Sequence, residues 1–251
     1  MRGMIAVFKR ELSGYFITPV AYVFIVVFLV LVGVFTFSES FGNFYGSNPQ
    51  GSGQASLVSF FAYHPWLYLF LIPAISMRLW AEEHRSGTIE LLSTLPIRTW
   101  AIVVGKFAAA WVFAGIALAL TFPMWMTVNF LGEPDNGVIA AGYIGSLVLA
   151  GGLLAIGACI SAATKSQVIA FVLSVVACLA FLLAGYSPVL SFIEAWAPQT
   201  IVETVASFSF LTHFQGISQG VIEARDVVFF GSLIGLALLV NAIVLELKRG
   251  S

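Results

Sequence analysis

The sequence predicts an all-α integral membrane protein with six transmembrane helices. Three observations support this prediction. Of 251 residues, 60% are hydrophobic and only 9% are charged, whereas a soluble domain carries about 25% charged residues. The charged residues leave long stretches of chain between them without any charge, and the basic residues lie almost entirely on one side of the predicted membrane.

Charge-free stretches locate the predicted spans, because a helix needs about 20 apolar residues to cross about 30 Å of hydrocarbon. Two such stretches contain polar parts that are not expected to cross. The beginning of 40–77 is rich in Gly, Asn, Pro and Ser, and 204–222 is rich in Ser, Thr and Gln, which is typical of loops or of interfacial or re-entrant structure. The predicted spans lie near residues 17–37, 60–78, 101–131, 138–163, 167–187 and 227–246.

Residues 1–16 precede the first span and alternate apolar with charged side chains, including Lys9, Arg10 and Glu11. This pattern is typical of a helix that lies in the membrane interface, where basic groups meet anionic headgroups. A plain cytoplasmic anchor is the alternative. The apolar run that begins near Ile17 is too long for the core of a cleavable signal and is not followed by an A-x-A-like site, so we expect it to be retained as a span.

The basic residues predict the orientation. With six spans both chain ends share a side, and this side holds ten of the eleven basic residues, whereas the other holds only Arg225. We therefore expect both termini to be cytoplasmic. The ten residues are Arg2, Lys9, Arg10, Arg78, Arg85, Arg98, Lys106, Lys165, Lys248 and Arg249.

Six charged side chains form a cluster, five of them between predicted spans two and three and the sixth, Lys106, near the start of span three. Each charge costs about 2.5–3.5 kcal/mol at the bilayer centre, so burying all six in lipid costs roughly 15–20 kcal/mol. The cluster must therefore lie outside the hydrocarbon, on the cytoplasmic side. Its members are Glu82, Glu83, Arg85, Glu90, Arg98 and Lys106.

The local sequence predicts a short helix within this cluster. Gly87 is expected to end the extension of span two and to cap a new helix from Thr88 to Leu95, which Pro96 ends. Glu90, three residues after the cap, can accept from the free amide there and favours the positive start of the helix.

The short helix carries the apolar residues Ile89, Leu91 and Leu92. This apolar surface is too large for a solvated loop helix, so it docks either on a partner or on the membrane face of this same chain. Local features alone favour neither alternative.

Several classes of chemistry are excluded. Gly105-Lys106 is not a phosphate-binding loop, because Trp100 stands where the first glycine belongs and Phe107 stands where Ser or Thr is needed. There is no H-E-x-x-H or G-x-S-x-G motif and no Asp or Glu in the interior of a predicted span, which disfavours hydrolases and proton-coupled carriers. Cys159 and Cys178 lie in apolar runs, so we expect reduced packing residues. We expect a non-catalytic chain without a cofactor, a metal ion or nucleic acid.

The stretch E-E-x-x-S-G-T-I-E-L-L-S-T-L-P-I at 82–97, followed by Gly105-Lys106, resembles the signature of type-2 ATP-binding-cassette (ABC-2) transporter permeases. Residues 9–19 and 188–222 also resemble the interfacial helix and the re-entrant hairpin of that family, and 210–226 resembles the branch that includes the gliding-motility permease component. The resemblance covers the whole length.

The resemblance implies a single ABC-2 transmembrane domain over 1–251. Within it, 79–98 is the coupling region, with a coupling helix between spans two and three. Residues 188–226 form an extracytoplasmic or re-entrant region before span six. It also implies a multi-pass protein of the bacterial inner membrane.

The same resemblance implies partners and site residues. Two ABC ATP-binding subunits would carry ATP and Mg, a second permease copy or a paralogue would complete a dimer, most simply a homodimer, and an extracytoplasmic accessory protein is a further candidate partner. The implied coupling interface consists of Glu82, Glu83, Arg85, Gly87, Thr88, Ile89, Glu90, Leu91 and Leu92.

Three functions remain in competition on the sequence. The favoured one is the permease subunit of an ATP-driven exporter. The second is the membrane anchor of an ATPase-driven mechanotransmission complex that moves no solute, and the third and least favoured is a secondary carrier or channel. The predicted pathway has apolar side chains and no ring of charges, which favours amphipathic or hydrophobic cargo, or none.

Overall fold

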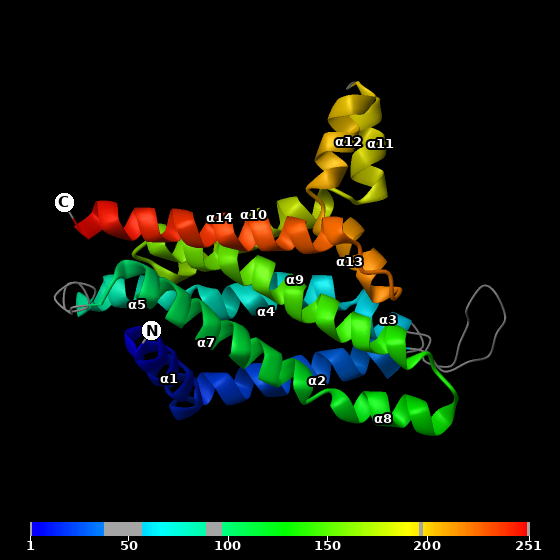
Figure 1. The fold of residues 1–251 in the computed structure, drawn as a ribbon, viewed down its shortest axis with the longest axis horizontal. Helices are drawn as coiled ribbons and strands as arrows, with labels where there is room; N and C mark the ends of the chain where they lie inside the picture. The colour runs from blue at the N-terminus through cyan, green and yellow to red at the C-terminus, as the bar shows by residue number, and fades with distance from the viewer. Residues whose placement is uncertain (1, 38–56, 89–96, 196–197, 250–251) are drawn as a thin grey trace.

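The computed structural model describes residues 2–37, 57–88, 97–195 and 198–249. Within these ranges the chain forms helices joined by turns and no strand, which confirms the all-α prediction (Figure 1). The helices are α1 (Arg2–Ile17), α2 (Pro19–Phe37), α3 (Val58–Ala62), α4 (His64–Ser76), α5 (Arg78–Ser86), α7 (Thr99–Ala119), α8 (Phe122–Leu131), α9 (Asn136–Ala163), α10 (Gln167–Leu183), α11 (Ser187–Glu194), α12 (Gln199–Ser207), α13 (Phe210–Ser218) and α14 (Ala224–Arg249).

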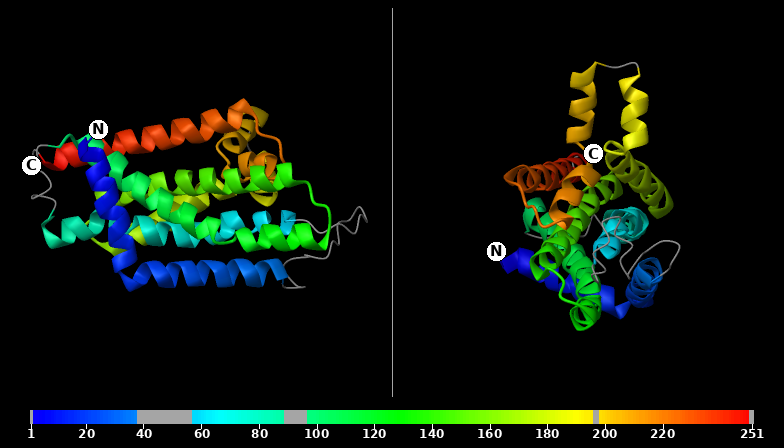
Figure 2. Two further views of the ribbon diagram at one scale, coloured as in Figure 1. Left: turned by 60° about the horizontal axis from the view of Figure 1, so that its bottom comes forward. Right: turned by 90° about the vertical axis from the view of Figure 1, so that its right-hand side faces the viewer.

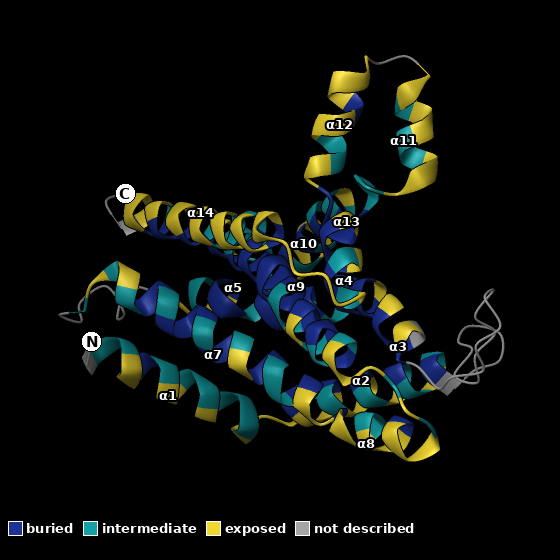
Figure 3. Cartoon of the chain, turned by 45° about the vertical axis from the view of Figure 1, so that its right-hand side comes forward, coloured by how far each residue is buried: buried dark blue, intermediate teal, exposed yellow. Residues whose placement is uncertain are grey.

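The long helices lie side by side along one axis, with α9 in the middle (Figures 1 and 2). α9 packs against α4, α7, α10, α13 and α14, and it is largely buried. Figure 3 shows the buried surface of α9 and the exposed outer side of α14. α2 and α14 expose apolar side chains over most of their length, among them Val23 and Leu236. This is the pattern of helices at the lipid-facing edge of a bundle.

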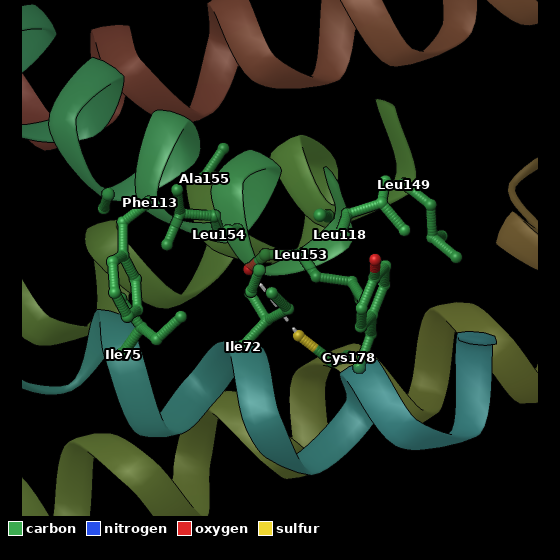
Figure 4. Close-up of a cluster of buried hydrophobic side chains, with 14 of the residues drawn as sticks. Ile72, Ile75, Phe113, Leu118, Leu149, Leu153, Leu154, Ala155 and Cys178 are labelled. Atoms are coloured by element: carbon green, nitrogen blue, oxygen red, sulfur yellow. Dashed lines mark hydrogen bonds between the residues drawn. The ribbon is translucent and has the colours of Figure 1, made fainter. Parts of the chain in front are cut away.

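Apolar side chains from four of these helices meet at the centre of the bundle (Figure 4). Ile72 of α4, Phe113 of α7 and Leu153 of α9 are almost completely buried there. Cys178 of α10 joins them, and its Sγ donates to the carbonyl of Leu153 at 3.9 Å. Both cysteines are free thiols, so packing of the spans holds this core together.

Within the described residues, four segments are long and apolar enough to cross a membrane, namely α2, α7 with α8, α9 and α14. A fifth counts if α10 and α11, which meet at a bend of 72°, form one span. The stretch predicted as span two is divided into the short helices α3, α4 and α5. The protein is thus a membrane protein with several apolar helices, and the six-span layout stays a prediction.

The segment predicted as one span over 101–131 is interrupted. α7 ends at Ala119 and α8 begins at Phe122, with Pro123 in its first turn. Proline has no amide hydrogen to donate and its ring crowds the preceding turn. Pro123 therefore cannot continue α7 without loss of a backbone hydrogen bond, and the helix is interrupted just before it.

The beginning of α1, the end of α14 and α5 lie at one end of the bundle, which we name the α5 end (Figures 1 and 2). α3, α8 and α11 to α13 lie towards the opposite end. α1 runs across the axis of the spans and packs on α7. A helix forms at Arg2–Ile17, where one was predicted, and its crossing direction agrees with the interfacial position, which stays a prediction.

The region 188–226 contains two different structures. α11 and α12 form a hairpin that stands away from the bundle (Figure 1). α13 returns into the bundle, where Phe210, Phe214 and Ile217 are buried against α9 and its neighbours. Only α13 therefore has the inward position expected of a re-entrant element.

A buried polar pair joins α13 to α14. His213 Nδ1 lies 2.6 Å from Asp226 Oδ1, and His213 Nε2 donates to the carbonyl of Ser207 at 3.1 Å. The second carboxylate oxygen of Asp226 accepts from the amide of Glu223 at 3.3 Å. These bonds connect the end of α12, the middle of α13 and the start of α14.

Candidate functional site

α5 follows α4 directly after Met77, at the end of the stretch predicted as span two. Its first turn is buried through Leu79, Trp80 and Ala81, and the rest of the helix has no buried residue. It ends at Gly87, whose φ of 72° is the left-handed conformation that glycine adopts at no steric cost. This confirms the prediction that the extension of span two ends here.

The structure places part of the predicted coupling interface. Glu82, Arg85, Gly87 and Thr88 are exposed along and beyond α5. Ile89, Glu90, Leu91 and Leu92 lie outside the described residues, as does all of the predicted short helix after Thr88, so this helix stays a prediction.

Glu83 differs from its neighbours because its side chain points inward and is only 15% exposed. Its Oε1 atom lies 2.7 Å from Nζ of Lys106, a residue of α7 that is only 3% exposed. Lys106 Nζ also lies 3.3 Å from Glu11 Oε1. It donates to the carbonyl of Leu79 at 3.2 Å and stands over the ring of Trp80 at 5.1 Å. One ammonium group thus joins α1, α5 and α7, and we name Glu11, Glu83 and Lys106 the charged triad.

Arg10 supplies a second positive charge. Its guanidinium lies 2.6 Å from Glu11 and 3.9 Å from Glu83, and its side chain is 56% exposed. Two cations therefore face two carboxylates. This balance matters because a buried charge without a partner is strongly destabilising.

The pKa values of the two carboxylates in the triad are shifted in opposite directions, down for Glu11 and up for Glu83. Burial alone would raise the pKa of Glu11, but the charges of Lys106 and Arg10 outweigh burial and hold that pKa below its ordinary value. Burial raises the pKa of Glu83, and the charge of Lys106 offsets this only in part. Glu83 therefore depends on Lys106 more strongly than Glu11 does.

The triad was not predicted from the sequence. Sequence patterns placed Lys9, Arg10 and Glu11 in the headgroup region, and the family resemblance placed Glu83 at the interface with an ATP-binding subunit. In the structure Lys9 and Arg10 are exposed, whereas Glu11 and Glu83 turn towards Lys106. A signal was present in Lys106 itself, because a lone lysine at the start of an apolar span needs carboxylate partners.

A second set of bonds joins α5 to α9. The hydroxyl of Ser161 donates to the carbonyl of Met77 at 2.9 Å and accepts from the amides of Trp80 and Ala81, both at 3.1 Å. His84 Nε2 donates to the carbonyl of Ala162 at 3.1 Å.

The C-terminal carbonyls of α9 receive a further donor from α14. Lys248 donates to Ala162 and Ala163 at 2.8 and 2.9 Å. Basic groups at this position satisfy the last carbonyls of a helix and complement its dipole. Burial and the charges of Lys248 and Lys165 lower the pKa of His84.

α5 also contacts α10. The carboxylate of Glu82 accepts from Gln167 at 2.6 Å and lies 3.5 Å from Arg78, one turn earlier. α5 is therefore bonded to α1, α7, α9 and α10 while its outer side is exposed.

Comparison with known proteins identifies the family. Residues 5–247 match the family described as ABC-2 family transporter protein. The chain belongs to this family. The resemblance found in the sequence is thereby confirmed, and the ABC-2 protein is a membrane subunit of a transporter type that works with an ATP-binding subunit.

A shorter similarity connects this ABC-2 protein with the heme exporter protein B of Rhodobacter capsulatus. The two are 32% identical over 91 residues, which cover 36% of this chain and 40% of the relative. The matched part is therefore less than half of either protein.

Proposed function

We propose that this ABC-2 protein is the non-catalytic permease subunit of an ABC transporter and couples ATP hydrolysis by a separate subunit to export or to work outside the cytoplasm. The observation that carries the proposal is the position of α5. It extends from predicted span two, exposes one side at the end expected to be cytoplasmic, and contacts four helices on its other side through polar and charged groups.

The exposed and the inward side of α5 would have separate tasks. Glu82 and Arg85 would contact the ATP-binding subunit, together with Gly87, Thr88 and the segment that follows. Glu83 would pass the displacement of α5 to α1 and α7 through Lys106, at 2.7 Å. Short charge-assisted bonds of this kind are directional, so a rotation of α5 changes the positions of the helices that it contacts.

The proposed assembly contains two ATP-binding subunits, with ATP and Mg on them, and two permease chains in the bacterial inner membrane. A homodimer is the simplest form of this assembly. Cytoplasmic termini are supported by the ten basic residues on that side. The name of the R. capsulatus relative makes heme the first cargo to test.

Mechanotransmission without a transported solute is the second candidate, and the α11–α12 hairpin favours it. The hairpin stands away from the bundle (Figure 1) and exposes Phe192 and Ile201. Exposed apolar side chains of this size are common at protein interaction sites. An accessory protein outside the cytoplasm could bind there.

Purification of the detergent-solubilised protein with its bound subunits tests the proposal. We expect an ATP-hydrolysing subunit to co-purify, and Arg85→Glu to weaken its binding by at least about tenfold, which corresponds to ~1.4 kcal/mol. Arg225→Glu is the matched control, because Arg225 is also exposed but lies at the opposite end. Equal retention by both variants would place the interface elsewhere, and recovery of the chain without any ATPase would refute the transporter assignment.

A further inference from the structure

The junction between α4 and α5 has an unusual cap. α4 ends at Ser76 and α5 begins at Arg78, with Met77 between them. The first amides of a helix lack partners within it, and Met77 makes no side-chain capping bond. Ser161 of α9 supplies the missing acceptor, because its hydroxyl accepts from the amides of Trp80 and Ala81.

The same hydroxyl also bonds the other side of the junction, where it donates to the carbonyl of Met77 at 2.9 Å. A serine hydroxyl has one hydrogen to donate and two lone pairs, so all its hydrogen-bonding capacity is used. Ser161 is completely buried. Removing the hydroxyl would leave two amides and one carbonyl without this partner, where water does not reach.

α9 also touches the end of α4. One turn before Ser161, a Cβ atom added to Gly157 would lie only 2.7 Å from Cβ of Ser76. Glycine is therefore required for this close approach. α9 thus contacts both sides of the junction, with Gly157 at the end of α4 and Ser161 at the start of α5.

The other polar contacts of α5 do not bridge this junction. Lys106 and His84 hold α5 against α7 and α9, and Glu82 holds it against α10. Among the side-chain bonds found in the described residues, those of Ser161 connect Met77 to the first turn of α5.

We propose that Ser161 is a positioning residue for coupling: its hydroxyl holds the α4–α5 junction to α9 and keeps α5 at a fixed angle to α4, so that the two helices move together. The inference rests on the proposed function, since it concerns how a displacement of α5 reaches span two. Without the hydroxyl, α5 still follows the ATP-binding subunit but no longer carries α4 with it.

Distance measurements between nitroxide labels test this proposal in the complete transporter complex in lipid nanodiscs. One label pair, at Ser86 and Lys165, reports the position of α5. The second pair, at Val58 and Glu133, reports the far end of the segment that continues into α4. All four positions are exposed. Each pair is measured without nucleotide and with ATP, Mg and vanadate, in a background in which Cys159 and Cys178 are replaced.

In the otherwise unchanged complex we expect both distances to change with nucleotide. In Ser161→Ala we expect the change at the first pair to remain and the change at the second pair to be lost. Ser146→Ala is the matched control, because Ser146 is an equally buried serine of α9 whose hydroxyl has no hydrogen-bond partner among the described residues. It should behave like the unchanged complex.

The outcomes separate the two proposals. If the first pair does not respond to nucleotide in the unchanged complex, the proposed function fails. If Ser161→Ala retains the full response of the second pair, or if Ser146→Ala loses it equally, the positioning role of Ser161 is refuted. A Ser161→Ala chain that does not assemble, while Ser161→Thr assembles and responds, would show that the hydroxyl serves folding and would likewise overturn the proposal.

Discussion

Replacement of Lys106 by methionine is the most direct test of the charged triad. The substitution keeps the length of the side chain but removes the charge that lies 2.7 Å from Glu83 and 3.3 Å from Glu11. Breaking a buried ion pair by removing one partner costs ~3–5 kcal/mol. For a chain of this size, this loss corresponds to a melting temperature lower by roughly 6–20 °C.

The geometry predicts which second substitution restores stability. Glu11 keeps Arg10 at 2.6 Å, whereas Glu83 retains only Arg10 at 3.9 Å, and its Oε2 atom has no partner in the described residues. Glu83→Gln should therefore recover most of the loss caused by Lys106→Met, and Glu11→Gln should recover much less. The measurement is thermal unfolding in detergent near neutral pH, followed by tryptophan fluorescence, for the single and double variants.

The pH dependence gives an independent check. The pKa of Glu83 already lies above its ordinary value of 4.5, and without Lys106 it rises further. The folded protein then takes up a proton at higher pH than the unfolded chain does, so acidification favours the folded state. The decrease in melting temperature caused by Lys106→Met should be largest at neutral pH and become smaller as the pH falls towards 4.5. A single variant that melts within about 2 °C of the unchanged protein, less than ~1 kcal/mol, would refute the reasoning, and so would equal rescue by both second substitutions.

Three further predictions concern neighbouring contacts. Gly157→Ala should cost ~1–3 kcal/mol by overpacking against Ser76, and thermal unfolding should show partial recovery when Ser76→Gly is added. The pKa of His84 is lowered from 6.5, so the folded state favours neutral His84 and loses stability as the pH falls below 6.5. The melting temperature should therefore be lower at about pH 5.5 than at about pH 7.5, and His84→Gln should remove the part of this decrease that His84 causes. His213→Ala should leave Asp226 buried without its partner, cost ~3 kcal/mol and speed proteolysis of the α11–α12 hairpin.

The charge-free stretches predicted the positions of several long helices closely. Residues 138–163 became α9 (Asn136–Ala163), and 227–246 became the central part of α14 (Ala224–Arg249). Long apolar runs leave the backbone in lipid no alternative to the helix, so composition alone locates them. The division of span two could not be predicted in the same way, because the bonds that satisfy the broken turn come from Ser161, far away in the chain.

The charged triad could not be predicted from the sequence either, because it also depends on residues far apart in the chain. Lys9, Arg10 and Glu11 are adjacent in the chain, but only Glu11 turns towards Lys106. Which side of α1 faces α7 is decided by packing, here by Val7 against Gly105 and by the ring of Tyr15, stacked at 4.9 Å on Phe113. Single-sequence patterns identify charged residues, and only the packed helices determine which of them meet.

α1 and α5 are held in the bundle by different kinds of contact. Apolar contacts such as the stacked ring of Tyr15 on Phe113 already hold α1 against α7, so the charges are not needed for that purpose. α5 is different, because beyond Ala81 it has no buried residue, and its position depends on the bonds of Glu82, Glu83 and His84. Close packing resists gradual displacement, whereas hydrogen bonds and ion pairs at a half-exposed helix can be exchanged for others at similar cost. The helix that we propose to move with an ATP-binding subunit is therefore better held by such bonds than by a packed apolar face.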